Sequence, residues 1–544
     1  MERPCPNDGV SWVIAEDQSE AIAFLSRPES YGGHATAVER IETHGAVVFL
    51  VGDRAYKLKR AVRFSYLDYS TAALRRRFCE AELALNRRTA PALYLGLKSL
   101  NRSAGGTLAF DGDGPAVDFV VVMRRFDQAD LFDRLAERGA LTPPLMLELA
   151  ETIARFHADS PPILDIGGSD GLAEVLASNG QNLALADETI FDPADIARVD
   201  GASRAMLHDR SALLDDRRRT GRVRHCHGDL HLRNICLIDG RPTLFDCIEF
   251  SRSLACIDLL YDLAFLLMDL RYRRLGDLAN GVLNRYLDVG DESPEGLATL
   301  PLFLSARAAI RAHIAATAAG QQSAGQQLDG GAGRRLGDEA RSYLSMAEEL
   351  LRPAPPMLVA IGGLSGTGKS TLAYGLAPEL GPAPGARVLR SDVLRKRLIG
   401  MPMATTLPDA AYSPEMTEKV YAALCGEAGR ALAAGHGVIV DAVSARERER
   451  DAIAAVARAA GVPFVGFWLE APHETLAARI AARRSVARRA PSHERDASDA
   501  TVDVLRRQLT FDLGRLDWVR LDAAADPQAC LAEARRRLSG LDLE

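Results

Sequence analysis

Hydrophobic and polar positions follow three different patterns along the chain, and each pattern predicts a different kind of structure. Between about residues 30 and 125, short apolar runs alternate with polar residues, and AVVFLVGDRAYKLKR predicts a β-hairpin that turns at Gly52-Asp53. One helical period occurs there, in TAALRRRFCEAELALNRR. From about 126 to 351 the helical period dominates. After 357, short apolar strands alternate with helical segments.

A Pro-rich segment, RPAPPM at 352–357, separates the second pattern from the third and predicts a domain boundary. We therefore expect a first domain at 1–351 and a second domain at 358–544. The first would be an α+β domain, with a strand-rich lobe at about 30–125 and a helical lobe at about 126–351. The alternation in the second predicts an α/β domain with a parallel sheet covered by helices.

Composition limits the classes of protein that fit these patterns. A net charge of -7 counts against a dedicated nucleic-acid-binding protein. No apolar run reaches the roughly 18 to 20 residues that cross a bilayer, and the N-terminal residues lack the pattern of a secretory signal, so we expect a cytoplasmic protein without a membrane partner. The eight cysteines never form C-x-x-C, a zinc or redox motif. The low-complexity stretch at 319–335 predicts a loop between helices.

The strongest chemical motif is GLSGTGKS at 363–370, between a predicted strand and a predicted helix. Its glycines let backbone N–H groups close around phosphates, and the helix N-terminus adds a positive dipole. Lys369 is expected to reach the β- and γ-phosphates of ATP, and Ser370 to ligate Mg²⁺. The nucleotide-binding candidates are Gly363, Gly366, Gly368, Lys369, Ser370 and Thr371.

Residues after this motif offer the remaining groups that phosphoryl transfer needs. Asp392, at the end of the next predicted strand, is placed to accept the proton of an acceptor hydroxyl, with Arg395 one helical turn later to hold an anionic group. Asp441 ends another apolar strand and is suited to holding Mg²⁺ through water. An arginine-rich stretch contains Arg479 and Arg483, which are candidates for a mobile lid; a solvated helix face is the alternative.

These motifs resemble the small P-loop kinases, the group that includes gluconate kinase, zeta toxin and the kinase domain of polynucleotide kinase. The resemblance covers about residues 357 to 520. It implies that Asp392 is the carboxylate on the acceptor side and that Arg479 and Arg483 belong to the lid. A nucleic-acid 5′-hydroxyl kinase stays open as an alternative, although the acidic net charge and the lack of interleaved aromatics count against it.

The first domain carries a second constellation, in VRHCHGDLHLRNICLIDGRPTLFDCIEF at 223–250. Asp229 is placed to take a hydroxyl proton, while Asn234 and Asp246 offer oxygens to Mg²⁺. Glu249 is a further candidate ligand. Because these residues adjoin apolar strands, where an unpaired carboxylate is costly, the pattern favours a functional site over a surface loop.

This constellation resembles the aminoglycoside phosphotransferase and choline kinase families, which are built on the protein-kinase fold. The catalytic loop H-x-D-x-x-x-x-N of that fold matches His227, Asp229 and Asn234, and LFDCIEF matches its metal-binding segment at Asp246. The resemblance implies a structural role for His227. One departure is that ETHGAVVFL replaces the glycine-rich loop that covers the phosphates in protein kinases.

The same resemblance requires a strand lysine paired with a helix glutamate. RAYKLKRAV offers Lys57 and Lys59 on one face of a strand, because the side-chain period is two. We favour Lys57, with Glu82 as its partner and Glu80 as the alternative. VVVMRR, at 120–125, falls where the adenine-contacting hinge is expected. The segment IDLLYDLAFLLMDL matches the helix that supports the catalytic loop, through its first two aspartates, Asp258 and Asp262.

The whole chain resembles bacterial two-domain proteins that join a phosphotransferase domain to an ATP-binding kinase domain. It predicts a double kinase that uses ATP and Mg²⁺ at two sites and phosphorylates hydroxyls of a small-molecule acceptor, such as a sugar or a nucleoside. Whether the two sites act separately or in sequence on one molecule stays open. In one alternative, only one domain is catalytic and the other regulates it by binding nucleotide. In another, the protein confers antibiotic resistance, and acidic residues at 169–200 attract a polycation. The acceptor, the choice between adenine and guanine, and the oligomeric state stay open at this point.

Overall fold

The computed structural model describes residues 13–32, 37–43, 45–63, 67–324, 330–487, 498–524 and 526–540. The chain forms two compact units, and each combines several sequence segments. Unit 1 comprises Met1–Leu141, Arg155–Asp187 and Leu214–Leu266. Unit 2 comprises Thr142–Ala154, Glu188–Leu213 and Leu267–Glu544. Each unit has its own β-sheet.

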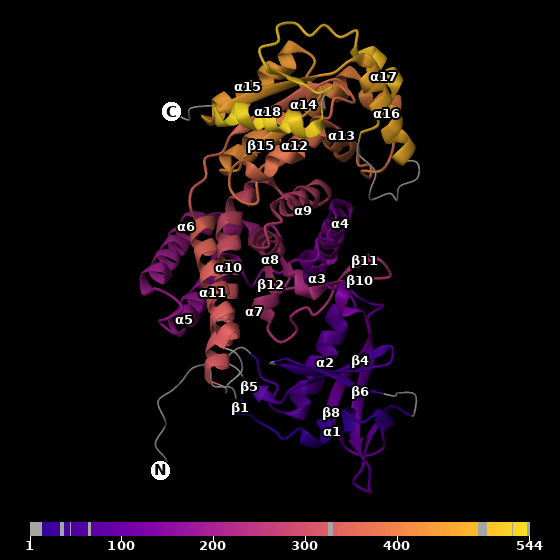
Figure 1. Cartoon of the computed structure of the whole chain (residues 1–544), viewed down its shortest axis with the longest axis vertical. Coiled ribbons are helices and arrows are strands. Elements are labelled where there is room, and N and C mark those ends of the chain that lie inside the picture. Colours follow the sequence, from indigo (N-terminus) through magenta and orange to yellow (C-terminus); the bar gives the residue numbers. More distant parts are fainter. Residues whose placement is uncertain are drawn as a thin grey trace. The chain divides into compact units, whose positions relative to one another are not determined.

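Unit 1 contains a six-stranded antiparallel sheet in the order β2-β3-β4-β8-β6-β7 (Figure 1). Its strands are β2 (Glu39–Glu42), β3 (Ala46–Val51), β4 (Arg54–Lys59), β6 (Tyr94–Arg102), β7 (Leu108–Phe110) and β8 (Ala116–Arg124). The predicted hairpin is confirmed, since β3 pairs with β4 and Gly52 adopts a φ of 55° at the turn. Strands β3 and β8 carry nearly continuous buried residues, and successive side chains point to opposite faces of the sheet, so both faces are covered. Helix α2 (Ala72–Asn86) packs on one face, and α1 (Ser19–Leu25) packs on the other.

The remaining elements of unit 1 are short strand pairs and helices. The strands are β1 (Val13–Ile14) paired with β5 (Val62–Arg63), β9 (Val223–His225) with β12 (Cys256–Asp258), and β10 (Ile235–Ile238) with β11 (Arg241–Leu244). The helices are α3 (Phe132–Glu137), α5 (Gly168–Ala184) and α7 (Arg252–Ala255). Three longer helices contribute residues to both units, namely α4 (Pro143–Asp159), α6 (Pro193–Arg219) and α8 (Leu259–Tyr272). The β10–β11 hairpin turns at Asp239 and Gly240, which both have positive φ.

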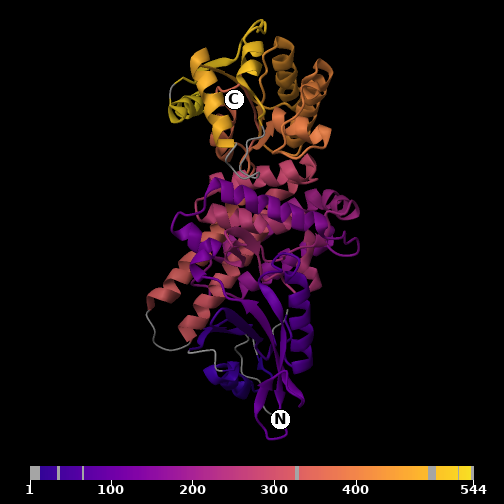
Figure 2. The same ribbon diagram turned by 90° about the vertical axis from the view of Figure 1, so that its right-hand side faces the viewer.

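Unit 2 contains a parallel five-stranded sheet in the order β14-β15-β13-β16-β17, as the alternating pattern predicts. Its strands are β13 (Leu358–Gly363), β14 (Arg387–Arg390), β15 (Val438–Asp441), β16 (Phe464–Glu470) and β17 (Val519–Asp522). Figure 2 shows helices on both sides of this sheet. They are α12 (Lys369–Leu376), α13 (Ser391–Ile399), α14 (Pro414–Ala433), α15 (Glu447–Ala460), α16 (His473–Ala487), α17 (Val502–Gln508) and α18 (Pro527–Ser539).

The prediction of a loop over 319–335 is wrong for most of that stretch. Helix α10 (Leu300–Ala324) continues into it and α11 (Gly330–Leu350) begins within it. Alanine and glutamine are good helix formers, which fits the helical ends of this stretch, and residues 325–329 lie outside the described residues. No described helix combines the length and apolar character that crossing a bilayer requires.

Helix α9 (Gly276–Val289) covers the edge strand of the parallel sheet with buried polar groups. The Oδ1 atom of Asn284 accepts hydrogen bonds from Val388 N at 2.8 Å and from Arg387 Nη1 at 3.1 Å, and its Nδ2 atom donates to Ala386 O at 3.1 Å. The Asp288 carboxylate lies 2.6 Å from the Arg387 guanidinium. Asn284, Asp288 and Arg387 are all buried. These contacts satisfy polar groups at the outer edge of β14, the strand that precedes Asp392.

Candidate functional sites

Lys57, in β4, lies between two carboxylates in unit 1. Its Nζ atom donates to Glu82 Oε1 at 2.8 Å and to Asp246 Oδ1 at 2.6 Å. Burial would lower the pKa of Lys57, but the charges of Asp246 and Glu82 outweigh burial and raise this pKa well above its ordinary value. The alternative partner, Glu80, instead forms a surface ion pair with Arg76. Lys57 therefore joins the strand, helix α2 and the Asp246 segment as a charged group.

Lys59 forms a second, deeper network on the same strand face. Its Nζ atom lies 2.5 Å from Glu82 Oε2 and 2.5 Å from Glu249 Oε1. Tyr69 donates its hydroxyl to Glu249 and lies 3.3 Å from the ammonium of Lys59. Both candidate lysines therefore share Glu82, and Glu249 is occupied by Lys59 and Tyr69.

The pKa of Glu82 gives the first prediction. Burial would raise this pKa, but the charges of Lys57 and Lys59 outweigh burial and lower it from 4.5 to about 2. A lowered carboxyl pKa stabilises the fold above pH 4.5, and this stabilisation is lost as the pH falls towards 2. We expect Glu82→Gln to lower the free energy of unfolding at pH 7 by about 2 to 3 kcal/mol.

Urea unfolding at a series of pH values measures this effect. The stability of wild type should fall more steeply than that of Glu82→Gln between pH 4.5 and pH 2. Glu80→Gln is the matched control, because Glu80 lies two residues earlier in α2 and is exposed. Equal pH dependence in wild type and Glu82→Gln would contradict the account of this carboxylate.

Asp229 and Asn234 are neighbours in the loop between β9 and β10. The Nδ2 atom of Asn234 donates to Asp229 Oδ2 at 2.8 Å and to Asp229 O at 2.9 Å. His231 Nε2 lies 3.3 Å from the same carboxylate oxygen. His227 is fully buried, and its Nε2 atom donates to Phe245 O at 2.8 Å. Burial lowers the pKa of His227, so its neutral ring holds the loop in place, consistent with a structural role.

Asp262, in α8, holds this loop through hydrogen bonds to its backbone. Its carboxylate accepts hydrogen bonds from the backbone N–H groups of residues 227 and 228, at 3.1 and 2.8 Å. His157 Nε2 lies 3.0 Å from it and was missed in the sequence, where a single buried histidine on a helix gives no distinct signal. Asp258 plays a separate role, since it binds Arg217 through two contacts of 2.7 and 2.8 Å.

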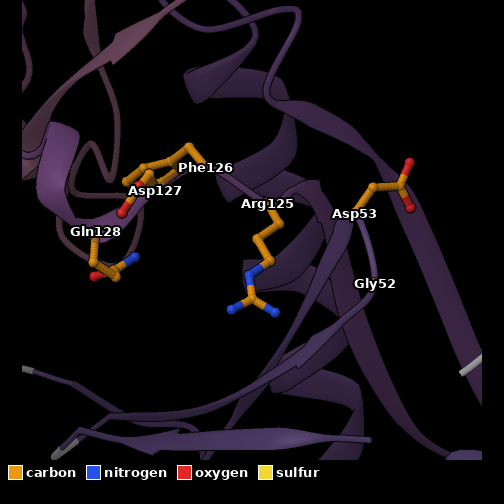
Figure 3. Close-up of a pocket in the computed structure, with 6 residues that line it drawn as sticks. All are labelled: Gly52, Asp53, Arg125, Phe126, Asp127 and Gln128. Atoms are coloured by element: carbon orange, nitrogen blue, oxygen red, sulfur yellow. The ribbon is translucent and has the colours of Figure 1, made fainter. Parts of the chain in front are cut away.

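A cavity of about 430 Å³ lies at the end of β8, next to the segment that the sequence predicts as the hinge. Figure 3 shows the Arg125 guanidinium and the Gln128 amide directed towards its open space, while the Asp53 carboxylate points away. The Nη2 atom of Arg125 also donates to Glu39 at 3.0 Å. The lining residues are Gly52, Asp53, Arg125, Phe126, Asp127 and Gln128.

The phosphate-loop motif of unit 2 connects β13 to α12. Gly363, Gly366 and Gly368 adopt φ values of 137°, 89° and 92°. A Cβ atom at Gly366 would also lie 2.9 Å from a backbone oxygen, so this position requires glycine. The backbone N–H of Ser365 donates to Gln508 Oε1 at 2.8 Å. Gln508, at the end of α17, thus holds the loop, and nothing in the sequence pattern indicated it.

Lys369, Ser370 and Thr371 form the first turn of α12. The Oγ atom of Ser370 donates to Asp441 Oδ2 at 2.6 Å, and Arg390 Nε lies 3.4 Å from the same oxygen. A hydroxyl and a carboxylate oxygen are the donor set that suits Mg²⁺. Burial lowers the pKa of Lys369, against the opposing charges of Asp441 and a neighbouring aspartate. The ammonium donates to a carbonyl oxygen within the loop at 3.1 Å.

The acceptor-side candidates lie on α13. Asp392 occupies the first turn of this helix, so the predicted position at the end of the preceding strand is wrong by two residues. Its charge acts on Lys369, which places the two groups near one another. Arg395 is buried, and its Nη1 atom donates to Ala411 O at 2.8 Å. In this structure Arg395 therefore binds the segment that follows α13.

The two lid candidates on α16 have different surroundings. Arg479 Nη1 donates to Ala523 O at 2.7 Å, at the end of β17. The positive charge of Arg483 contributes to lowering the pKa of Lys369, so Arg483 lies near the phosphate loop. The role of both arginines in a lid stays a prediction. Residues 488–497 of the same arginine-rich stretch lie outside the described residues.

Models of two protein families match the chain. The model of the Phosphotransferase enzyme family matches residues 48–299. A model described as an AAA domain matches residues 358–511. Together they confirm the fold class predicted for each part, a protein-kinase-like phosphotransferase fold followed by a P-loop kinase-like fold.

Relatives with both parts are present among curated proteins. Uncharacterized proteins of Mycobacterium tuberculosis and Mycobacterium bovis are 30% identical over 505 residues, which cover 91% of this chain and 94% of each relative. Among solved structures, a choline/ethanolamine kinase family protein from Mesorhizobium loti is 14% identical and covers 61% of this chain and 95% of its own, with a TM-score of 0.38. A gluconokinase from Sinorhizobium meliloti is 24% identical and covers 35% of this chain and 99% of its own, with a TM-score of 0.22.

Proposed function

We propose that this chain, which belongs to the family of two-domain phosphotransferases that includes the mycobacterial relatives, is a double kinase. Each domain would transfer the γ-phosphoryl group of ATP to a hydroxyl of a small molecule, with Mg²⁺ as cofactor. The observation that supports this proposal is that each domain contains both a lysine and polar oxygen groups of the kinds that phosphoryl transfer needs. Each has a partly buried lysine, oxygen ligands suited to Mg²⁺ and a carboxylate that could serve the acceptor.

In the first domain, Lys57 would bind the phosphates of ATP, held in place by Glu82. Asn234 and Asp246 would hold Mg²⁺, which neutralises charge on the phosphates when it is bound. Asp229 would accept the proton of the acceptor hydroxyl, since Asn234 orients its carboxylate.

In the second domain, the backbone N–H groups of the phosphate loop and Lys369 would bind the phosphates. Ser370 and Asp441, which already share a hydrogen bond, would hold Mg²⁺. Asp392 would accept the acceptor proton, and Arg483 would neutralise charge on the transferred group.

The proposal is tested by incubating the full chain with ATP, Mg²⁺ and a panel of sugars, nucleosides and aminoglycosides, and identifying the products by mass spectrometry. Lys369→Ala is expected to lose the products of the second domain and to keep those of the first. If Lys369→Ala loses no product, or if Asp229→Asn and Lys369→Ala each abolish every product, the chain is not a double kinase.

A further inference from the structure

Tyr412 is an aromatic residue of unit 2 that lies near the acceptor-side candidates on α13. It follows α13 and lies against that helix, because the Arg395 guanidinium sits over its ring at 4.9 Å from the centroid. Arg395 is itself fixed, by its hydrogen bond to Ala411 O. Tyr412 nevertheless keeps 41% of its surface exposed. One face of the ring is thus covered by a cation, while part of the side chain is open to solvent.

The ring is also held at its hydroxyl. Tyr412 donates its O–H to Asp499 Oδ2 at 2.9 Å, and the same oxygen accepts the backbone N–H of Leu407 at 3.0 Å. The other oxygen of Asp499 lies 3.3 Å from Lys396 Nζ. Lys396 is 1% exposed and donates to Met403 O at 2.8 Å, so the anchor is buried. Lysine is rare in this chain, which uses arginine at most basic positions, so the presence of Lys396 is itself notable in the sequence.

The fixed ring lies against the helix that carries Asp392. Arg395, which covers the ring, lies one helical turn after Asp392 on α13. Burial raises the pKa of Tyr412, and the hydrogen bond to Asp499 and the charges of Asp499 and Asp392 raise it further. The hydroxyl therefore stays protonated and remains a donor to Asp499. An exposed aromatic ring with no rotational freedom to lose is a preorganised stacking surface.

We propose that the open face of Tyr412 binds the acceptor of the second domain by stacking, and that this acceptor is an alcohol with a ring, such as a pyranose or a nucleoside. Asp499 and Arg395 are positioning residues, because they act through the ring. The proposal rests on the proposed function of this domain. It adds the class of acceptor and a residue that selects it.

Equilibrium binding of two probes tests the proposal without requiring turnover. The full chain, saturated with Mg²⁺ and a non-hydrolysable ATP analogue, is titrated with adenosine and with methyl β-glucopyranoside. We expect one of the two probes to bind, and Tyr412→Leu to weaken its binding roughly tenfold, the range that loss of one aromatic stacking partner gives. Tyr412→Phe, which keeps the ring, should stay within about threefold of wild type, because a hydroxyl bond contributes less than the stacked face.

Each outcome decides the proposal. Tyr412-dependent binding of adenosine supports a nucleoside acceptor, and such binding of the glucoside supports a sugar. Equal binding by wild type and Tyr412→Leu, or binding of neither probe, overturns the proposal. Affinity for the ATP analogue is measured in every variant, and it should not change, which separates loss of stacking from loss of folding. Failure of the double-kinase proposal would instead appear as product formation that does not depend on Lys369.

Discussion

Replacing Asp229 by Asn is expected to lower kcat for the first domain's product by roughly 10² to 10⁴-fold, the contribution of a general base in proton transfer. The substitution keeps the size of the side chain and its contact with Asn234, but the amide cannot take a proton. The KM for ATP should change little, because Asp229 does not lie among the expected phosphate ligands. Products of the second domain should form at the wild-type rate.

Steady-state kinetics on each product separately measures this effect. Asp239→Asn is the matched control, because Asp239 is an exposed carboxylate at the β10–β11 turn, where asparagine also tolerates positive φ. It should leave both activities unchanged. If Asp229→Asn lowers kcat for the first domain's product by less than tenfold, Asp229 is not the base. If kcat falls equally for the products of both domains, the substitution disturbs the whole fold.

Replacing Arg387 by Met is expected to destabilise the chain by about 3 to 5 kcal/mol, the cost of removing one partner from a buried ion pair. The Asp288 carboxylate lies 2.6 Å from the Arg387 guanidinium, and both side chains are buried. Methionine fills part of the volume but leaves the buried Asp288 side chain without the cation that it contacts. The side-chain oxygen of Asn284 also loses one of its two donors, Arg387 Nη1 at 3.1 Å, and keeps the backbone N–H of Val388.

Chemical unfolding followed by circular dichroism gives this free energy. Arg448→Met is the matched control, since Arg448 makes an exposed ion pair with Glu418 in the same unit and should cost at most about 1 kcal/mol. Helix α9 lies within the region matched by the phosphotransferase family, and strand β14 lies within the region matched by the AAA domain. Arg387→Met therefore also tests whether the stability of each region depends on the other. Equal stability of both variants would contradict that dependence.

Much of both candidate sites could be predicted from the sequence because their motifs are local. The spacing of Asp229 and Asn234 fits one loop, and the hydrogen bond between them closes over five residues. The phosphate loop likewise needs only the strand before it and the helix after it. The sequence could also predict Glu82, and not Glu80, as the partner of Lys57, because the helical period indicates which face of an amphipathic helix points inward.

Contacts between distant segments could not be predicted in this way. Glu249 lies 190 residues from Lys59, and its ion pair with that lysine depends on how the catalytic segment folds back on the sheet. Gln508 meets the phosphate loop across 143 residues. Tyr412 becomes a candidate only when Asp499 and Arg395 are seen to hold its ring. Side-chain periods report which face of an element is buried, but not which element will cover that face.

The most direct test of a double kinase is to mix the two inactive halves. Asp229→Asn and Lys369→Ala are assayed alone and as an equimolar mixture, with every acceptor that wild type phosphorylates. If each domain is a kinase in its own right, the mixture regenerates all of the wild-type products, because each variant supplies the reaction that the other has lost. If one domain only regulates the other within the same chain, the products that the two variants fail to form alone are also missing from the mixture. That result would contradict the account.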